Sequence, residues 1–253
     1  TADARGEAVL TAVDQLLLAG DLVGARARRP AVEALPDSPR RSFLRGRLAY
    51  VLGPRPEARA LLERAWTEAT GDDPPGHPTS DALGRPGAGR TGDGGDSDVR
   101  PAATTPADAG GTADPGGPVP EPADPVLAGR IAALLATVAV DRADGAQGAL
   151  WARRSMELAG GAAADCNDGH MLAMARALQN RVADGIAELD AALADPPSQP
   201  AAVSDLRLGR GVLRLWAHDL RGGAEDLKAC LGAWGAGGSL VNRETARFYL
   251  AEL

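Results

Sequence analysis

The sequence has little of the chemistry on which most enzymes depend. Its single lysine, Lys228, stands in the stretch DLKACL, so the Gly-Lys-Ser/Thr end of a phosphate-binding loop is absent. Aromatic residues make up only 3% of the chain, which has three histidines and two cysteines. There is no Gly-x-Ser-x-Gly motif for a nucleophilic serine. We therefore expect no enzymatic activity and no cofactor in this chain.

Long apolar runs and a disulfide pattern are also absent. The longest apolar run, Ile131 to Val140, has half of the roughly 20 residues that a membrane-spanning helix needs. Cys166 and Cys230 are too few for a disulfide framework and suit a reducing compartment. We expect a cytoplasmic protein that does not contact a membrane. The chain lacks an initiator Met and stops in mid-pattern, so we expect it to be a piece of a longer protein.

Basic residues show no excess that would suit nucleic acid. The formal net charge is −7, from 34 acidic and 27 basic residues. Residues 71–124 hold ten of the acids and three of the arginines, which leaves 24 acids (34 minus 10) and 24 basic residues (27 minus 3) elsewhere. A nucleic-acid-binding chain normally presents a basic face, so we expect no direct contact with nucleic acid.

What is abundant divides the chain into two blocks. Residues 71–124 are rich in Gly, Pro, Asp, Ala and Thr with almost no large apolar side chain, so we predict a disordered insertion there. A G-x-G-x-x-G match at Gly87–Gly92 lies inside this stretch without the flanking strand and helix of a dinucleotide site. We predict two helix-pair repeats over 1–70, and three more with a truncated sixth over 125–253.

Helix signals dominate both blocks. Ser38-Pro39 and Asp124-Pro125 each place an N-capping side chain before a proline of the first turn. Asp165 with Asp168 indicates a capping arrangement at the start of a later helix. Strand-like alternation and hairpin turns are lacking. The sequence therefore predicts an all-α fold.

A repeat of about 34 residues connects the helices. Small residues recur in the second helix of each unit at gaps of 33, 91, 36 and 38, and the gap of 91 becomes 37 without the 54-residue insertion. These markers are Ala25, Ala58, Ala149, Gly185 and Gly223. Twelve residues before them stand Val13, Gly46, Thr137, Ala173 and Gly211, four of which are small. We expect the two sets to mark close helix crossings.

This period is that of the tetratricopeptide repeat, in which each unit is an antiparallel helix pair. We predict a tetratricopeptide-repeat-like right-handed superhelix interrupted by the disordered insertion. The expected pairs span residues 6–35, 39–70, 125–159, 165–195 and 201–235, and a sixth unit is expected to begin at Glu244.

Two groups of side chains resemble reactive sites. The stretch Leu215–Trp234 holds His218, Lys228 and Cys230, but in the repeat register it is the turn and second helix of the fifth pair. Cys166 and His170 lie four residues apart on one helical face, which is possible for two metal ligands, yet no third ligand presents itself. We favour structural roles for both groups and expect no metal site.

Several stretches resemble the helical-repeat region of large ATP-binding LuxR-type transcriptional regulators of actinobacteria. They are RPEARALLERAWTEA, GALWARRSMELA, LRLGRGVLRLWAHDLRGGAEDLKACLGAW and VNRETARFYLAEL. In that family a nucleotide-binding module precedes the repeats and a helix-turn-helix follows them. Neither module lies in this chain, so the resemblance implies a sensor and interaction region that relays to domains elsewhere in the parent protein.

A repeat superhelix recognises partners on its concave face, which the first helices line. By register the candidates on that face are Arg40, Phe43, Arg47, Tyr50, Asn167, His170 and Asp205. At the equivalent face of the third pair, Ile131, Leu134 and Val138 suggest an apolar ligand or a docked neighbouring domain. The expected partner is a protein, a peptide, a small effector or a neighbouring domain of the parent protein. The alternative is a free-standing tetratricopeptide-repeat adapter between proteins.

Overall fold

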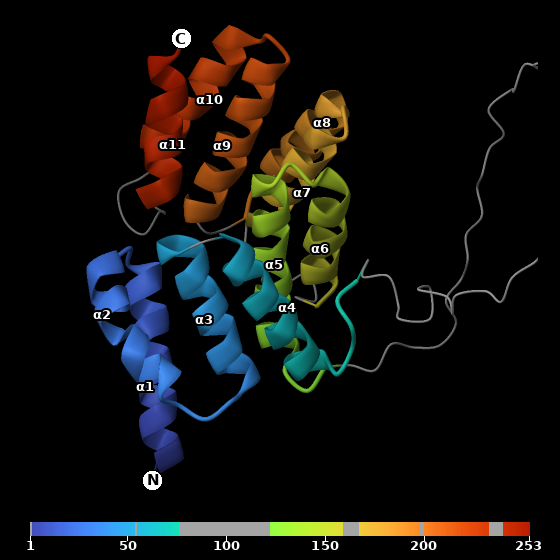
Figure 1. The fold of residues 1–253 in the computed structure, drawn as a ribbon. Coiled ribbons are helices and arrows are strands. Elements are labelled where there is room, and N and C mark those ends of the chain that lie inside the picture. Colours follow the sequence, from blue (N-terminus) through green and yellow to red (C-terminus); the bar gives the residue numbers. More distant parts are fainter. Residues whose placement is uncertain (1, 54, 76–121, 159–166, 198–199, 233–239) are drawn as a thin grey trace, which may run out of the picture. The chain divides into compact units, whose positions relative to one another are not determined.

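The computed structural model describes residues 2–53, 55–75, 122–158, 167–197, 200–232 and 240–253. All of them belong to one compact unit, Thr1–Gly76 with Glu121–Leu253. They form eleven α-helices and no strand. Figure 1 shows how these helices are arranged. The helices are α1 (Ala2–Leu18), α2 (Leu22–Glu33), α3 (Pro39–Leu52), α4 (Arg55–Thr70), α5 (Pro125–Asp141), α6 (Gly145–Leu158), α7 (Asn167–Leu178), α8 (Val182–Ala194), α9 (Pro200–Trp216), α10 (Leu220–Gly232) and α11 (Leu240–Ala251).

Consecutive helices pack as antiparallel pairs, which confirms the predicted all-α architecture. The five expected pairs correspond to α1–α2, α3–α4, α5–α6, α7–α8 and α9–α10. The predicted start of the sixth unit is wrong: α11 begins at Leu240, four residues before Glu244. Of the predicted insertion, residues 76–121 lie outside the described residues. None of the described helices combines the length and the hydropathy of a membrane-spanning segment.

Two helices begin at the N-capping side chains that the sequence predicted. Ser38 accepts a hydrogen bond from the backbone N–H of Arg41 at 3.2 Å, and Pro39 opens α3. Asp124 accepts from the N–H of Leu127 at 2.9 Å before α5. Each cap satisfies one of the backbone donors that the first turn leaves unpaired. Asp165 of the other predicted cap lies outside the described residues.

A common turn joins the two helices of four pairs. One residue of each turn has a positive φ, between 58° and 74°: Gly20, Ala143, Asn180 and His218. In the fifth pair the N–H of His218 bonds to the carbonyl of Leu215, and the N–H of Asp219 bonds to that of Arg214. This is the Schellman arrangement, which ends a helix through a left-handed residue. In three of the four turns an aspartate follows and caps the second helix, as Asp219 does for the N–H of Gly222 at 2.9 Å.

The small-residue markers lie at close helix crossings in the fourth and fifth pairs. A Cβ atom at Gly211 would lie 3.2 Å from the carbonyl oxygen of Gly223, its partner twelve residues on. A Cβ atom at Gly185 would lie 2.7 Å from the carbonyl oxygen of Ala173, again twelve residues away. Real Cβ atoms essentially never come within 3.0 Å of another heavy atom, so a larger residue at Gly185 would force α7 and α8 apart, and one at Gly211 would need a smaller adjustment.

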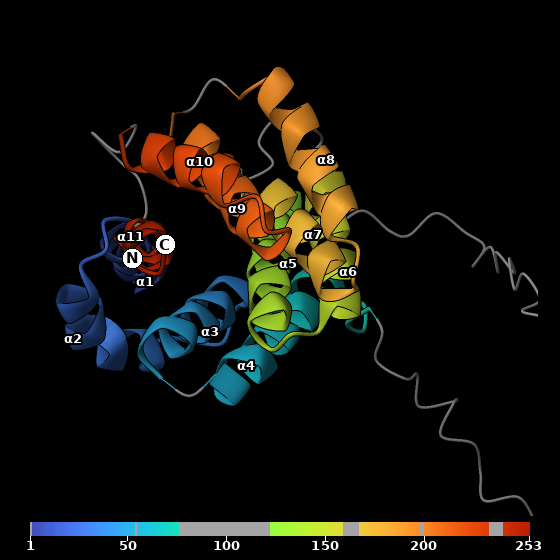
Figure 2. The same cartoon turned by 90° about the horizontal axis from the view of Figure 1, so that it is seen from above.

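The first helices of the pairs pack on one another in series, from α1 through α3, α5, α7 and α9 to α11. Figures 1 and 2 agree in placing α3 between α1 and α5, and α9 between α7 and α11. We name the surface along these six helices the A-helix face. The largest buried apolar cluster extends from α1 to α7, and two smaller ones lie among α7 to α11.

Candidate functional site: the A-helix face

Polar side chains on the A-helix face bond across neighbouring first helices at equivalent repeat positions. Arg40 of α3 forms an ion pair with Glu7 of α1, 33 residues earlier. Its Nη2 also donates to the Thr11 hydroxyl at 2.9 Å. The Arg40 side chain is one-third exposed, so this contact holds it at the surface without removing it from solvent.

Asp14 of α1 joins three first helices. Its carboxylate lies in an ion pair with Arg47 of α3, again 33 residues apart. Nη2 of Arg130, on α5, donates to both carboxylate oxygens, at 2.8 and 2.9 Å. The Arg130 guanidinium carbon also lies 5.0 Å from the centre of the Phe43 ring, within cation–π range. Asp14 is only 7% exposed, so its charge is balanced by two guanidinium groups rather than by water.

Two further contacts extend this pattern. The Tyr50 hydroxyl of α3 lies 2.7 Å from an Asp141 carboxylate oxygen of α5, and the separation of 91 residues is one repeat plus the insertion. Near the other end, the Asn242 side-chain amide of α11 donates to the Asp205 carboxylate of α9 at 2.6 Å, 37 residues apart. The repeat therefore aligns polar partners on successive first helices.

The structure brings four of the predicted site residues together on α3. Arg40, Arg47 and Tyr50 bond to α1 or α5 as described, while Phe43 is 3% exposed and lies beneath Arg130. Asp205 belongs to the C-terminal contact with α11. Asn167 begins α7, but its side chain lies outside the described residues.

The expected apolar binding surface on α5 is wrong. Ile131 is fully buried and Val138 is 1% exposed, and both belong to the main core cluster. Leu134 is half-buried and packs against the same cluster. These side chains hold α5 in the core because α5 lies between neighbours on several sides, and they are not presented to a ligand.

His170 lies in an apolar position of the repeat. Its equivalents in other first helices are the apolar Leu10, Phe43, Leu134 and Leu208. The ring packs on Gly209 of α9, where an added Cβ would lie 2.6 Å from a ring carbon. Burial lowers the pKa of His170 to about 4, and its Nδ1 has no hydrogen-bond partner in the described structure. The imidazole is therefore neutral at pH 7 and fills space between α7 and α9.

No cluster of three or more potential His, Cys, Asp or Glu metal ligands occurs among the described residues. Cys166, the proposed companion of His170, lies outside them. In the stretch Leu215–Trp234, Cys230 is fully buried, and burial raises the pKa of its thiol to about 11. The thiol stays protonated at neutral pH, which disfavours nucleophilic chemistry.

An ionic cluster between α8, α9 and α10 was not foreseen from the sequence. Arg210 of α9 donates through Nε and Nη2 to the carboxylate of Asp226 on α10, and through Nη1 to Asp190 on α8. Arg214, one turn later, donates to Asp226 at 2.8 Å. Hydrogen bonding to Asp226 is the main cause of the raised pKa of Arg210. The spacing of the two arginines, four residues apart on one helical face, was the available signal.

The polar side chains of the A-helix face pair mostly with one another. They are arginines, carboxylates, a tyrosine and an amide, which pair across helices. No protein-family model matches the sequence, and no curated protein or solved structure matches it either.

Proposed function

We propose that the chain is a tetratricopeptide-repeat-like binding scaffold whose A-helix face recognises a protein or peptide partner or a small effector. The observation that carries the proposal is the series of first helices, joined at equivalent positions by half-exposed polar side chains. Such a series offers a row of fixed hydrogen-bonding groups to a ligand that runs across several repeats.

The resemblance to LuxR-type regulators gives this scaffold a biological context. In that context the face senses a partner or effector and relays its binding to nucleotide-binding and DNA-binding domains of the parent protein. The repeat period and the close crossings at Gly185 and Gly223 support the repeat part of this proposal. The family-specific part of the proposal depends on the four sequence stretches that resemble LuxR-type regulators.

Site-specific photo-crosslinking tests the proposal. A benzophenone amino acid would replace Thr11 or Tyr50 on the A-helix face, and Arg28 or Lys228 on second helices in matched controls. We expect one defined adduct from the first two positions and none from the controls, in the parent protein within its own cells. Equal labelling from all four positions would contradict a preferred binding face.

The alternative, a free-standing adapter, predicts different cross-linked partners and a different gene structure. Cross-links to other domains of the same polypeptide would support the regulator, whereas cross-links only to separate proteins would support the adapter. Sequencing the gene on both sides of this segment gives an independent test. A phosphate-binding loop upstream and a helix-turn-helix downstream would favour the regulator, and start and stop codons near Thr1 and Leu253 would favour the adapter.

A further inference from the structure

Arg130 differs from the other arginines of the A-helix face in how it is held. Both of its hydrogen bonds to Asp14 use Nη2. Among the described residues, Nη1 and Nε have no partner, which leaves three N–H donors of the guanidinium open, two on Nη1 and one on Nε. The side chain is 33% exposed, so another group can approach these donors.

The position of this guanidinium is fixed before any ligand arrives. Asp14 binds it on one side, and the Phe43 ring, itself buried, lies 5.0 Å from its central carbon. Asp14 is in turn held by Arg47. A side chain restrained in this way loses less conformational entropy when it binds, because its rotamer is already chosen.

We propose that the open donors of Arg130 bind a carboxylate of an acidic peptide segment on the A-helix face. Hydrogen bonds between a guanidinium and a carboxylate are charge-assisted, and such bonds are among the stronger ones in proteins. This inference rests on the proposed function, since it names the kind of partner that the face accepts. Arg40, one turn before Phe43 on α3 and also one-third exposed, offers a second guanidinium on the same face.

Asp14 has two opposing effects in this site. It orients Arg130, and it also places a negative charge beside the group that a ligand carboxylate must reach. The side-chain amide of an Asp14→Asn variant keeps a hydrogen-bond acceptor for Arg130 but removes that charge. The site therefore makes opposite predictions for its two partners: loss of Arg130 weakens binding, and neutralisation of Asp14 strengthens it.

The test titrates the whole chain into a labelled hexaglutamate peptide at low ionic strength. The fluorescence anisotropy of the peptide measures its binding. We expect saturable binding that Arg130→Gln weakens about tenfold, the effect of losing a hydrogen-bonded charge partner. Asp14→Asn should tighten binding about threefold, because a repelling charge is gone. Arg221→Gln is the matched control: its side chain is 92% exposed on α10, and it should leave the affinity unchanged.

Three results of the peptide titrations would overturn the proposal. They are equal binding of hexaglutamine, unchanged affinity of Arg130→Gln, and a parallel loss of affinity and thermal stability in Arg130→Gln and Asp14→Asn. Binding of inorganic phosphate without binding of the peptide would also overturn it, in favour of a small anionic effector. A cross-linked partner that binds Arg130→Gln as tightly as the unchanged chain would refute this inference and leave the proposed function standing.

Discussion

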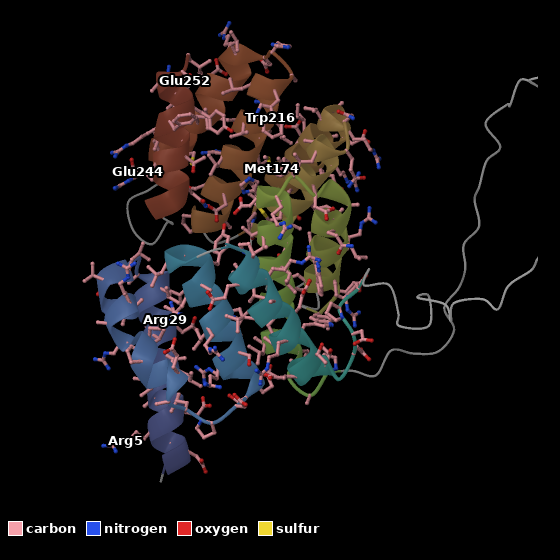
Figure 3. All side chains as sticks on the ribbon, in the orientation of Figure 1. Arg5, Arg29, Met174, Trp216, Glu244 and Glu252 are labelled. Atoms are coloured by element: carbon pink, nitrogen blue, oxygen red, sulfur yellow. The ribbon has the colours of Figure 1, made fainter. Side chains whose placement is uncertain are left out.

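Neighbouring first helices are joined by different chemistry in two parts of the A-helix face. Among α1, α3 and α5, ion pairs such as Glu7–Arg40 and Asp14–Arg47 connect the first helices. Between α7 and α9, the buried ring of His170 packs on Gly209, and Met174, labelled in Figure 3, packs against both C-terminal clusters. The repeat therefore determines where neighbouring helices touch, while individual side chains decide how each contact responds to acid and salt.

The small residues of the second helices also differ between the two halves. The second-helix markers of the N-terminal half are Ala25, Ala58 and Ala149, each buried, while those of the C-terminal half are Gly185 and Gly223. In the C-terminal half the backbones approach so closely that a Cβ does not fit. The addition of a single methyl group, by a Gly→Ala substitution, can test this contrast.

The largest effect is expected from Gly185→Ala. The new Cβ would lie 2.7 Å from the Ala173 carbonyl oxygen, so α7 and α8 must separate, at a cost of about 2 to 3 kcal/mol in unfolding free energy. Urea unfolding monitored by circular dichroism measures this. Gly232→Ala, at the end of α10 with no atom within 4 Å of the new Cβ, should be neutral. Equal stability of both variants would show that the closer approach has no energetic weight.

The second effect concerns acid sensitivity of the C-terminal half. Because the folded pKa of His170 is about 4 and the ordinary value is 6.5, the unfolded chain binds the proton first. Its contribution to stability is intact above pH 6.5 and is lost as pH falls toward 4. His170→Leu, which introduces the residue of three equivalent positions, should reduce the loss of unfolding free energy between about pH 7 and pH 4.5 by about 2 kcal/mol.

Thermal unfolding at a series of pH values provides the measurement. His218→Gln is the matched control, since it removes an imidazole from the exposed turn before α10. An unchanged acid response in His170→Leu would mean that the imidazole leaves its buried position before it gains a proton.

The third effect concerns the ion pairs among α1, α3 and α5. Asp14→Asn weakens the bonds of a nearly buried carboxylate to Arg47 and Arg130, and should cost about 1 to 2 kcal/mol. Glu225→Gln, which removes an exposed partner of Arg221, should cost less than about 0.5 kcal/mol. Chemical unfolding in urea at low and high salt checks both values. The Asp14 comparison is contradicted if the two variants lose the same stability.

The smallest effect is expected at a turn that the two halves share. His218 holds a φ of 64°, close to the conformation that Gly20 holds in the first pair. A side chain costs about 1 kcal/mol in this left-handed region and glycine does not. His218→Gly should therefore raise the melting temperature by a few degrees, and His218→Val should lower it. Thermal unfolding followed by circular dichroism measures both, and equal melting temperatures would contradict a strained turn.

The sequence predicted the parts of the fold that depend on local rules. Proline after an N-capping residue located the starts of α3 and α5, and the twelve-residue spacing of small residues identified the crossings. The start of the sixth unit was placed too late. We predicted it at Glu244, but the apolar residues from Leu240 onward already belong to α11.

The candidate site could be predicted only in part. Repeat register placed Arg40, Arg47 and Tyr50 on one stripe of α3, but it does not say which of many acids each would meet. The bond from Arg130 to Asp14 joins residues 116 positions apart and crosses two repeats. The pairing of Arg210 with Asp226 likewise depends on how whole helices pack, here α9 and α10. Such partners depend on side-chain reach in three dimensions, which periodicity does not encode.

The direct packing of α4 on α5 has a practical consequence. Residues 71–124 connect two helices whose neighbours are already in place, so this connection is a suitable insertion point for foreign sequence. Loop closure becomes only about 0.6 kcal/mol more costly for each doubling of the connection. A fluorescent protein or an affinity tag could therefore be grafted there, and both ends of the helical array would keep their native neighbours.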